Sequence, residues 1–171
     1  MTVINDTRRD FLAGGSMLAA GLVAAATPAQ AQAANVCGGL TREQYLDYVD
    51  LFNRNDPRFI QYYHDDVEFE LANAKVKGAQ AIREFYVDVK SHITETITLS
   101  HFISDATGIA AEIPTEFRVV KDWENGYFGR PLKVGMVMRI VSVALYRVRD
   151  GKFTHIKSVR MSTLNDWRME P

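Results

Sequence analysis

The chain contains only one cysteine, Cys37, among its 171 residues. No intrachain disulfide can form, so a fold held together by disulfide bonds is excluded. The four histidines lie at positions 64, 92, 101 and 155, and no two have the spacing of metal ligands. There is also no glycine-rich phosphate loop and no Gly-x-Ser-x-Gly nucleophile motif. We therefore expect neither a bound metal nor a cofactor.

Runs of like charge and long apolar runs are also missing. The formal net charge is −1, and no Lys/Arg-rich segment occurs, which argues against a nucleic-acid partner. Beyond residue 35, no stretch is long and apolar enough to cross a bilayer, so we expect no membrane span in the mature chain.

The first 35 residues have the features of an export signal. Arg8 and Arg9 form a twin-arginine pattern before an apolar stretch over residues 12–26, and small-x-small cleavage sites follow at 29–31 and 31–33. That stretch has about 15 residues, where a membrane span needs about 20. We expect a Tat signal and leader over 1–35, cleaved near residues 31–34, export to the periplasm, and a single domain over 36–171. An uncleaved signal that anchors the protein is the alternative.

The expected helices come first and the strands follow. Thr41 and Gln44 have the spacing of a capping box, which predicts a helix to about Asn53. Asp56 and Pro57 begin a second helix, and a third covers residues 79–91. Alternating residues predict strands near 67–71, 94–104, 109–121, 132–149 and 152–163, with a hairpin turn at 150–151. This order predicts an α+β fold with a long, mostly antiparallel sheet.

The 132–149 segment is apolar on both of its faces, whereas a strand that faces water on one side should alternate. A second layer must cover its outer face. We therefore expect the outer face of the sheet to form a homodimer or homotrimer interface.

Three tyrosine-containing segments carry a family resemblance. They are Tyr48-Val-Asp-Leu-Phe-Asn-Arg-Asn-Asp56, Tyr63-His-Asp-Asp66 and Ala81-Ile-Arg-Glu-Phe-Tyr86. In order and spacing they resemble the first half of bacterial ketosteroid isomerases, which are members of the NTF2-like (SnoaL-like) superfamily. The resemblance covers about residues 41–165. It implies a cone of three N-terminal helices packed on a curved, mixed but mostly antiparallel sheet around a pocket.

The resemblance also implies roles for individual residues. Tyr48 takes the position of a phenol that donates to a substrate oxyanion, and Tyr63 and Tyr86 would orient and polarise it. A phenol with an ordinary pKa of about 10 is neutral at pH 7 and can stabilise developing negative charge. The remaining substrate-binding wall falls on Phe69, Leu71, Phe117, Met138 and Ala144. Core aromatics on helical stripes are the alternative interpretation of the tyrosines.

The carboxylates of the isomerases are absent. Leu71 stands where the general base is expected, and no carboxylate lies between Lys133 and Asp150. Period-two counting puts His101 on the apolar face of its strand, where it could act as base or acid. The resemblance directs Arg160 toward the pocket, where it could bind an anion. A core histidine and a rim or interface arginine are the alternatives.

These residues favour a cofactor-independent lyase, dehydratase or isomerase. Tyr48, His101 and Arg160 would be its catalytic residues, and its substrate would be a small apolar, aromatic compound. Relatives of this fold include lyases that act on lignin-derived aromatics, which makes such compounds one option. The alternative is a periplasmic protein that binds a small ligand without catalysis. A third interpretation is a purely structural oligomerisation domain, whose pocket would be filled by its own side chains.

Overall fold

The structure is a computed structural model, and it describes residues 39–170. The expected signal over residues 1–35 lies outside the described residues. The described part contains helices α1 (Arg42–Asn53), η1 (Pro57–Tyr62) and α2 (Ala79–His92). Its strands are β1 (Tyr63–Leu71), β2 (Ala74–Lys77), β3 (Ile93–Ile97), β4 (His101–Ser104), β5 (Gly108–Val119), β6 (Met136–Arg149) and β7 (Lys152–Met169).

Local sequence signals account for where the helices begin. The Thr41 hydroxyl accepts from the Gln44 backbone, and the Gln44 side chain accepts from the Thr41 backbone, so the capping box is confirmed. Asp56 caps η1, with Pro57 at its first position. The expectation of three N-terminal helices is met only in part, because the second, η1, is a six-residue 3₁₀ helix. Such tight helices are used in short pieces because their hydrogen-bond geometry is poorer.

Seven strands form one mixed sheet in the order β2-β1-β7-β6-β5-β3, with β4 also paired to β5. Only β1 and β7 run parallel; the other pairs are antiparallel. The hairpin between β6 and β7 turns at Asp150 and Gly151, both with positive φ, as two-residue hairpin turns require. This confirms the expected α+β class and the mostly antiparallel sheet.

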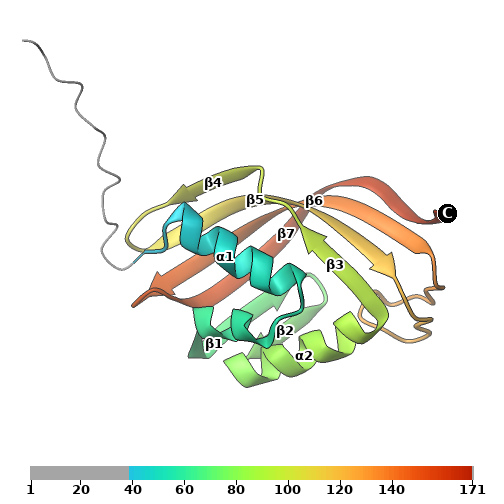
Figure 1. The fold of residues 1–171 in the computed structure, drawn as a ribbon, viewed down its shortest axis with the longest axis horizontal. Coiled ribbons are helices and arrows are strands. Elements are labelled where there is room, and N and C mark those ends of the chain that lie inside the picture. The colour runs from blue at the N-terminus through green and yellow to red at the C-terminus, as the bar shows by residue number, and fades with distance from the viewer. Residues whose placement is uncertain (1–38, 171) are drawn as a thin grey trace, which may run out of the picture. The chain divides into compact units, whose positions relative to one another are not determined.

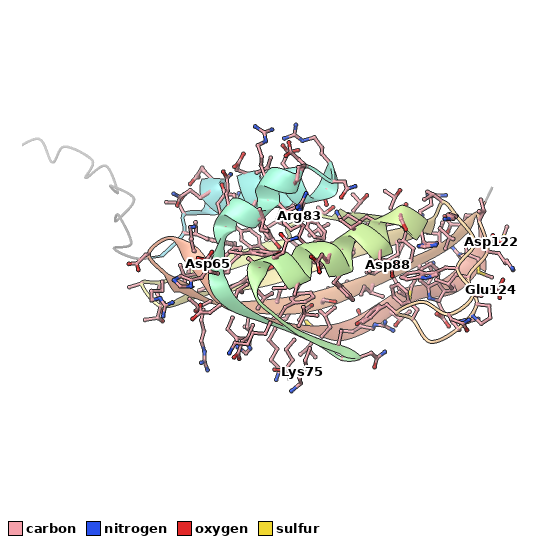
Figure 2. The ribbon with its side chains drawn as sticks, turned by 90° about the horizontal axis from the view of Figure 1, so that it is seen from below. Asp65, Lys75, Arg83, Asp88, Asp122 and Glu124 are labelled. Atoms are coloured by element: carbon pink, nitrogen blue, oxygen red, sulfur yellow. The ribbon has the colours of Figure 1, made fainter. Side chains whose placement is uncertain are left out.

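The two α-helices lie over one face of the curved sheet (Figure 1). The inner face of β5 buries every second residue, from Ile109 to Val119. One buried cluster joins α1 to β1 and the adjoining halves of β5 to β7, and a second lies beneath the end of α2, around Phe117 and Trp123. Charged side chains such as Lys75, Asp122 and Glu124 lie at the edges of the domain (Figure 2). None of the helices in the described part has the length and hydropathy of a membrane span.

Candidate functional site

A cavity of about 130 Å³ opens between the helices and the inner face of the sheet. An engineered cavity of ~150 Å³ holds one benzene molecule, so this cavity has room for about one aromatic ring. Its walls are mostly aromatic and aliphatic, with a few polar groups, which is the usual composition of a small-molecule site. The residues that line it are Tyr48, Phe52, Phe69, Leu71, Ala72, Phe85, Tyr86, Val89, Glu95, Ile97, Ile113, Thr115, Phe117, Tyr127, Phe128, Ile140, Ser142, Ala144, Tyr146, Ile156, Ser158 and Arg160.

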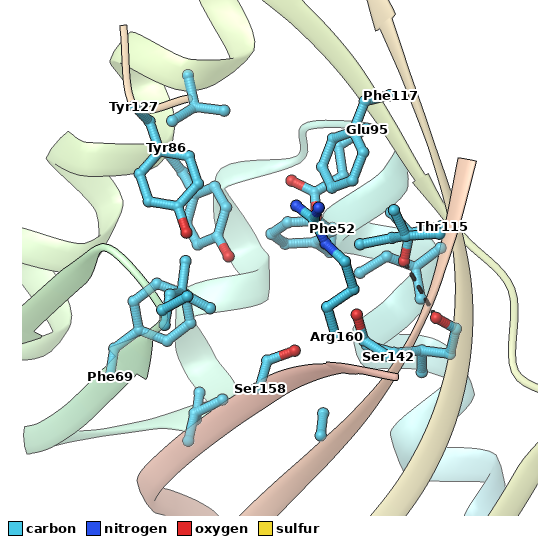
Figure 3. A pocket seen from close by; sticks show the side chains of 18 of the residues that line it. Phe52, Phe69, Tyr86, Glu95, Thr115, Phe117, Tyr127, Ser142, Ser158 and Arg160 are labelled. Atoms are coloured by element: carbon cyan, nitrogen blue, oxygen red, sulfur yellow. Dashed lines mark hydrogen bonds between the residues drawn. The ribbon is translucent and has the colours of Figure 1, made fainter. Parts of the chain in front are cut away.

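Glu95 is the one carboxylate in this lining. It projects from β3 into the cavity (Figure 3), and within residues 39–170 its carboxylate makes no hydrogen bond or ion pair. Burial raises the pKa of Glu95 to about 7, and the positive charge of Lys90 offsets part of that increase. At neutral pH both the protonated and the ionised forms are therefore present. A carboxyl group in this state can accept or donate a proton.

Two contacts fix the surroundings of Glu95: one ties its strand to α1, and the other ties α2 to α1. The Asn53 side chain, at the end of α1, donates to the Ile97 carbonyl at 2.9 Å and accepts from the Ile97 amide at 2.8 Å. Lys90, near the end of α2, donates to the Phe52 carbonyl and lies 3.5 Å from the centroid of the Phe52 ring. Burial lowers the pKa of Lys90 to about 8, and the charge of Glu95 opposes that decrease. The end of α1 is thus bonded to β3 close to Glu95, and the end of α2 is bonded to α1.

Phenol groups surround the carboxylate. The hydroxyls of Tyr48 and Tyr63 are 3.1 Å apart, which confirms part of the expected tyrosine string. Tyr86 does not join that string: its hydroxyl makes no hydrogen bond with the rest of the described chain, and its side chain faces the cavity (Figure 3). Burial raises the pKa of Tyr48 and of Tyr86 well above the ordinary value, and the charge of Glu95 adds to both shifts. Both phenols are therefore neutral hydrogen-bond donors.

A second tyrosine pair, which the sequence did not suggest, lies farther along the inner face. The hydroxyls of Tyr45 and Tyr146 are 2.9 Å apart, and both side chains are buried. Burial raises the pKa of Tyr45 to about 12. Because the two hydroxyls form a hydrogen bond with each other, the pair can be buried at this side of the site without leaving a polar group unpaired.

Arg160 lies on β7 and is the only cation in the lining. Its residue is exposed to solvent, and its guanidinium makes no ion pair or hydrogen bond within residues 39–170. Tyr127 is close enough that the charge of Arg160 lowers its pKa, against the larger raising effect of burial. With Phe128, Tyr127 belongs to the loop between β5 and β6, so aromatic side chains and a guanidinium share the solvent side of the cavity.

His101 does not face the cavity, so the prediction from period-two counting is wrong for this residue. Its side chain is 80% exposed and lies 3.5 Å from Glu112, on the face of the sheet opposite the cavity. Ile97 pairs with Thr115 of β5, and His101 pairs with Glu112 of β5. The chain advances four residues from Ile97 to His101, but the two partners on β5 are only three residues apart, so one residue is extra. This extra residue acts as a bulge, and in a strand a one-residue slip moves every later side chain to the other face.

The other expected site residues divide into three groups. Tyr63 is buried behind Tyr48 and does not reach the cavity. Met138 is also buried, but it packs in the cluster beneath α2 instead of lining the site. Those that the structure does bring together around the cavity are Tyr48, Phe69, Leu71, Tyr86, Phe117, Ala144 and Arg160.

Glu95 was missed, although the sequence contains a signal for it. It alternates with Ile93 and Ile97, which places a carboxylate on the apolar face of a strand. The period-two rule that placed His101 on that face holds up to Ile97 and fails beyond it. Within the described residues, no group of three or more His, Cys, Asp or Glu is arranged to hold a metal ion.

Comparison with known families assigns the chain. Residues 45–156 match the sequence model of the SnoaL-like domain. The chain belongs to the SnoaL-like family. This confirms the resemblance drawn from the tyrosine segments. A comparison with curated proteins finds no significant match.

Solved structures share the fold of this SnoaL-like domain. One is a putative polyketide cyclase from Pseudomonas putida KT2440, with 21% identity, 75% of this chain and 96% of that chain covered, and a TM-score of 0.61. A second is an M. tuberculosis LEH-like epoxide hydrolase, with 9% identity, coverage of 68% and 78%, and a TM-score of 0.56. A third, from Catenulispora acidiphila DSM 44928, has a ketosteroid isomerase-like fold and a bound trimethylamine, with 12% identity, coverage of 70% and 86%, and a TM-score of 0.55. At these identities the likeness shows the fold alone.

Proposed function

We propose that this protein is a cofactor-independent acid–base enzyme, of lyase, dehydratase or isomerase type, that acts on a small aromatic compound. The observation that carries this proposal is Glu95, a carboxylate that has no partner among residues 39–170 and lies in an apolar cavity, with a pKa raised to about 7. General acids and bases work best when their pKa lies near the operating pH. Groups displaced in this way are concentrated at functional sites.

The proposed chemistry begins with proton transfer to Glu95. The ionised carboxylate removes a proton from a carbon next to a substrate carbonyl, and the C–H electron pair moves onto the carbonyl oxygen. Tyr86 or Tyr48 donates a hydrogen bond to the resulting enolate oxygen. Glu95 then returns the proton, either to another carbon, which gives isomerisation, or to a leaving oxygen, which gives elimination. Tyr86 has the advantage that its hydroxyl is not engaged with another residue of the described chain.

Exchange of substrate protons with solvent tests this step without a known product. The full protein would be incubated in D₂O with a panel of aryl ketones, and loss of the α-proton signals would be followed by NMR. We expect exchange with at least one ketone and a fall of roughly 10²–10⁴-fold in Glu95→Gln. Glu112→Gln is the matched control, because this carboxylate lies on the opposite face of the sheet. Equal rates in Glu95→Gln and the wild-type protein would refute the proposal.

A non-catalytic ligand-binding protein is the second candidate, and the aromatic lining supports it independently of any base. Binding and turnover separate the two. Glu95→Gln in an enzyme loses turnover while the ligand remains bound, whereas in a binding protein it changes affinity at most. Ligand that binds without any exchange or conversion across the panel would favour the binding protein.

We also propose that a second copy of the chain covers the outer face of the sheet. Ile103 on β4, Leu145 on β6, and Val159 and Met161 on β7 are between 49% and 73% exposed. Val143 pairs with Val159, so this apolar area continues across two neighbouring strands. Exposed contiguous apolar patches mark interaction sites. Light scattering should give a dimer or trimer for the wild-type protein and a monomer for Leu145→Asp. Val87→Asp, on α2, is the control that should keep the wild-type mass.

Export to the periplasm by the twin-arginine route remains a proposal that rests on Arg8 and Arg9. Cell fractionation of the full chain should place it in the periplasm, and replacing both arginines with lysine should retain it in the cytoplasm.

A further inference from the structure

Two side chains of opposite charge face the same cavity without pairing to each other. Glu95 and Arg160 both line it, and both appear in the close view of Figure 3. No ion pair within 4.0 Å joins them, and neither forms one with another residue in 39–170. Burial in the apolar cavity makes the unpaired charge of Glu95 costly, whereas Arg160 is exposed to solvent and available to pair with a ligand.

The sheet order sets the spacing between the two charges. Glu95 belongs to β3 and Arg160 to β7, and β5 and β6 lie between these strands. Neighbouring strands are ~4.8 Å apart, so three steps separate β3 from β7 by roughly 14 Å. The two residues are also offset along the strands, because the register places Glu95 level with Met138 of β6, whereas Arg160 pairs with Ser142. A ligand that contacted both side chains would therefore extend through the cavity from one to the other.

The cavity that both charged residues line has room for one aromatic ring. Phe52, Tyr86 and Phe117 supply aromatic walls, and the cavity volume is about 130 Å³. Aromatic rings favour edge-to-face and offset contacts with such walls. Ser142 lies opposite Arg160 in the β6–β7 register and Ser158 is the next inward residue on β7, so hydroxyls accompany the guanidinium. Two hydroxyls thus lie beside Arg160 in the register, whereas the phenols of Tyr48 and Tyr86 accompany Glu95.

We propose that the substrates are aromatic carboxylic acids with a single ring. This inference rests on the proposed function, because it places the reacting group of the same substrate at Glu95. The carboxylate pairs with Arg160, whose planar guanidinium matches a carboxylate through two parallel hydrogen bonds. The opposite end of the ring presents an O–H or an acidic C–H to Glu95. Compounds with several fused rings, such as steroids, exceed the cavity.

Three probes test the class through equilibrium binding to the full protein by calorimetry. 4-Hydroxybenzoate offers both a hydroxyl and a carboxylate, its methyl ester offers the hydroxyl without the charge, and benzoate offers the carboxylate alone. We expect 4-hydroxybenzoate to bind roughly tenfold or more tightly than the methyl ester, because the charge-assisted bond to Arg160 is lost in the ester. Benzoate should lie between the two.

Substitutions identify the residue that binds the carboxylate of the ligand. Arg160→Gln should remove the preference for 4-hydroxybenzoate over its ester, while the ester itself binds as it does to the wild-type protein, which shows an intact cavity. Arg147→Gln is the matched control, because it removes the same charge from an exposed position that does not line the cavity. Equal affinity of the wild-type protein for acid and ester, or an equal loss of preference in Arg147→Gln, would overturn the proposal.

The binding test and the proton-exchange test distinguish failure of the substrate class from failure of the enzyme proposal. Proton exchange that needs Glu95 but shows no preference for acids would leave the enzyme in place and refute this substrate class. Acids that bind through Arg160 without exchange or conversion would keep the ligand class and refute the enzyme.

Discussion

On the outer face of the sheet, Arg139 donates a hydrogen bond to Glu116 at 2.8 Å and another to Glu170 at 2.7 Å, whereas Glu95 on the inner face has no partner in the described part of the chain. Hydrogen bonds from Arg139 lower the pKa of Glu170 to about 2. Burial raises that of Glu95 to about 7. The two carboxylates thus differ in pKa because one is paired and the other is desolvated.

This difference indicates which charges serve the fold. A paired charge at the surface can be kept for stability, whereas an unpaired one in an apolar cavity opposes folding. A destabilising group retained in a cavity is typical of functional sites, where activity and stability compete. Three sets of variants test this difference between the two carboxylates.

The largest effect on stability should come from Glu95→Gln. Because the pKa of Glu95 rises from 4.5 in the unfolded chain to about 7 in the folded one, the folded state resists ionisation. Stability of the wild-type protein should therefore fall as pH rises from about 4.5 to about 7, by up to about 3 kcal/mol. Urea unfolding at pH 8 should show Glu95→Gln to be more stable than wild type by that amount, and at pH 4 the two should coincide. A gap of the same size at both pH values would contradict this account.

A smaller loss is expected when the support of Glu95 is removed. Asn53→Ala deletes both hydrogen bonds to the Ile97 backbone and leaves those groups unpaired. We expect a loss of about 1–3 kcal/mol in the free energy of unfolding. Hydrogen exchange at the Ile97 amide should become faster, because the bond that protects it is gone. Gln61→Ala, an exposed amide on η1, is the control and should leave both quantities unchanged.

The smallest and most salt-dependent effect should come from the outer cluster. Arg139→Gln removes one of the two arginines that pair with both Glu116 and Glu170, and it should lower the melting temperature at low ionic strength. In 1 M salt, screening should bring the variant close to the wild-type value. A loss that does not change with salt would show that Arg139 acts through packing rather than charge.

Much of the fold could be predicted because its signals are local. The capping box at Thr41, the turn at Asp150 and Gly151, and the inward face of 109–119 each depend on neighbouring residues. The position of the second helix was predicted correctly, but its type was not. Pro57 indicates where a helix begins and does not distinguish an α-helix from a 3₁₀ helix.

The candidate site was harder to predict, because its members come from distant segments. Tyr48 and Arg160 were found through the family resemblance, and both line the cavity. His101 was misplaced by a bulge that only the pairing with β5 reveals. Glu95 was visible by alternation, but nothing local showed that a cavity lay in front of it.

The family, the α+β class and the apolar faces of the strands could be predicted from the amino-acid sequence, because they depend on composition, spacing and period. Tertiary structure alone decided which polar groups meet. Strand pairing placed His101 on the outer face and brought Glu95 and Arg160 into the lining of one cavity. The pKa of Glu95 follows from that arrangement, since desolvation depends on residues from α1, α2 and the sheet that lie far apart in the chain.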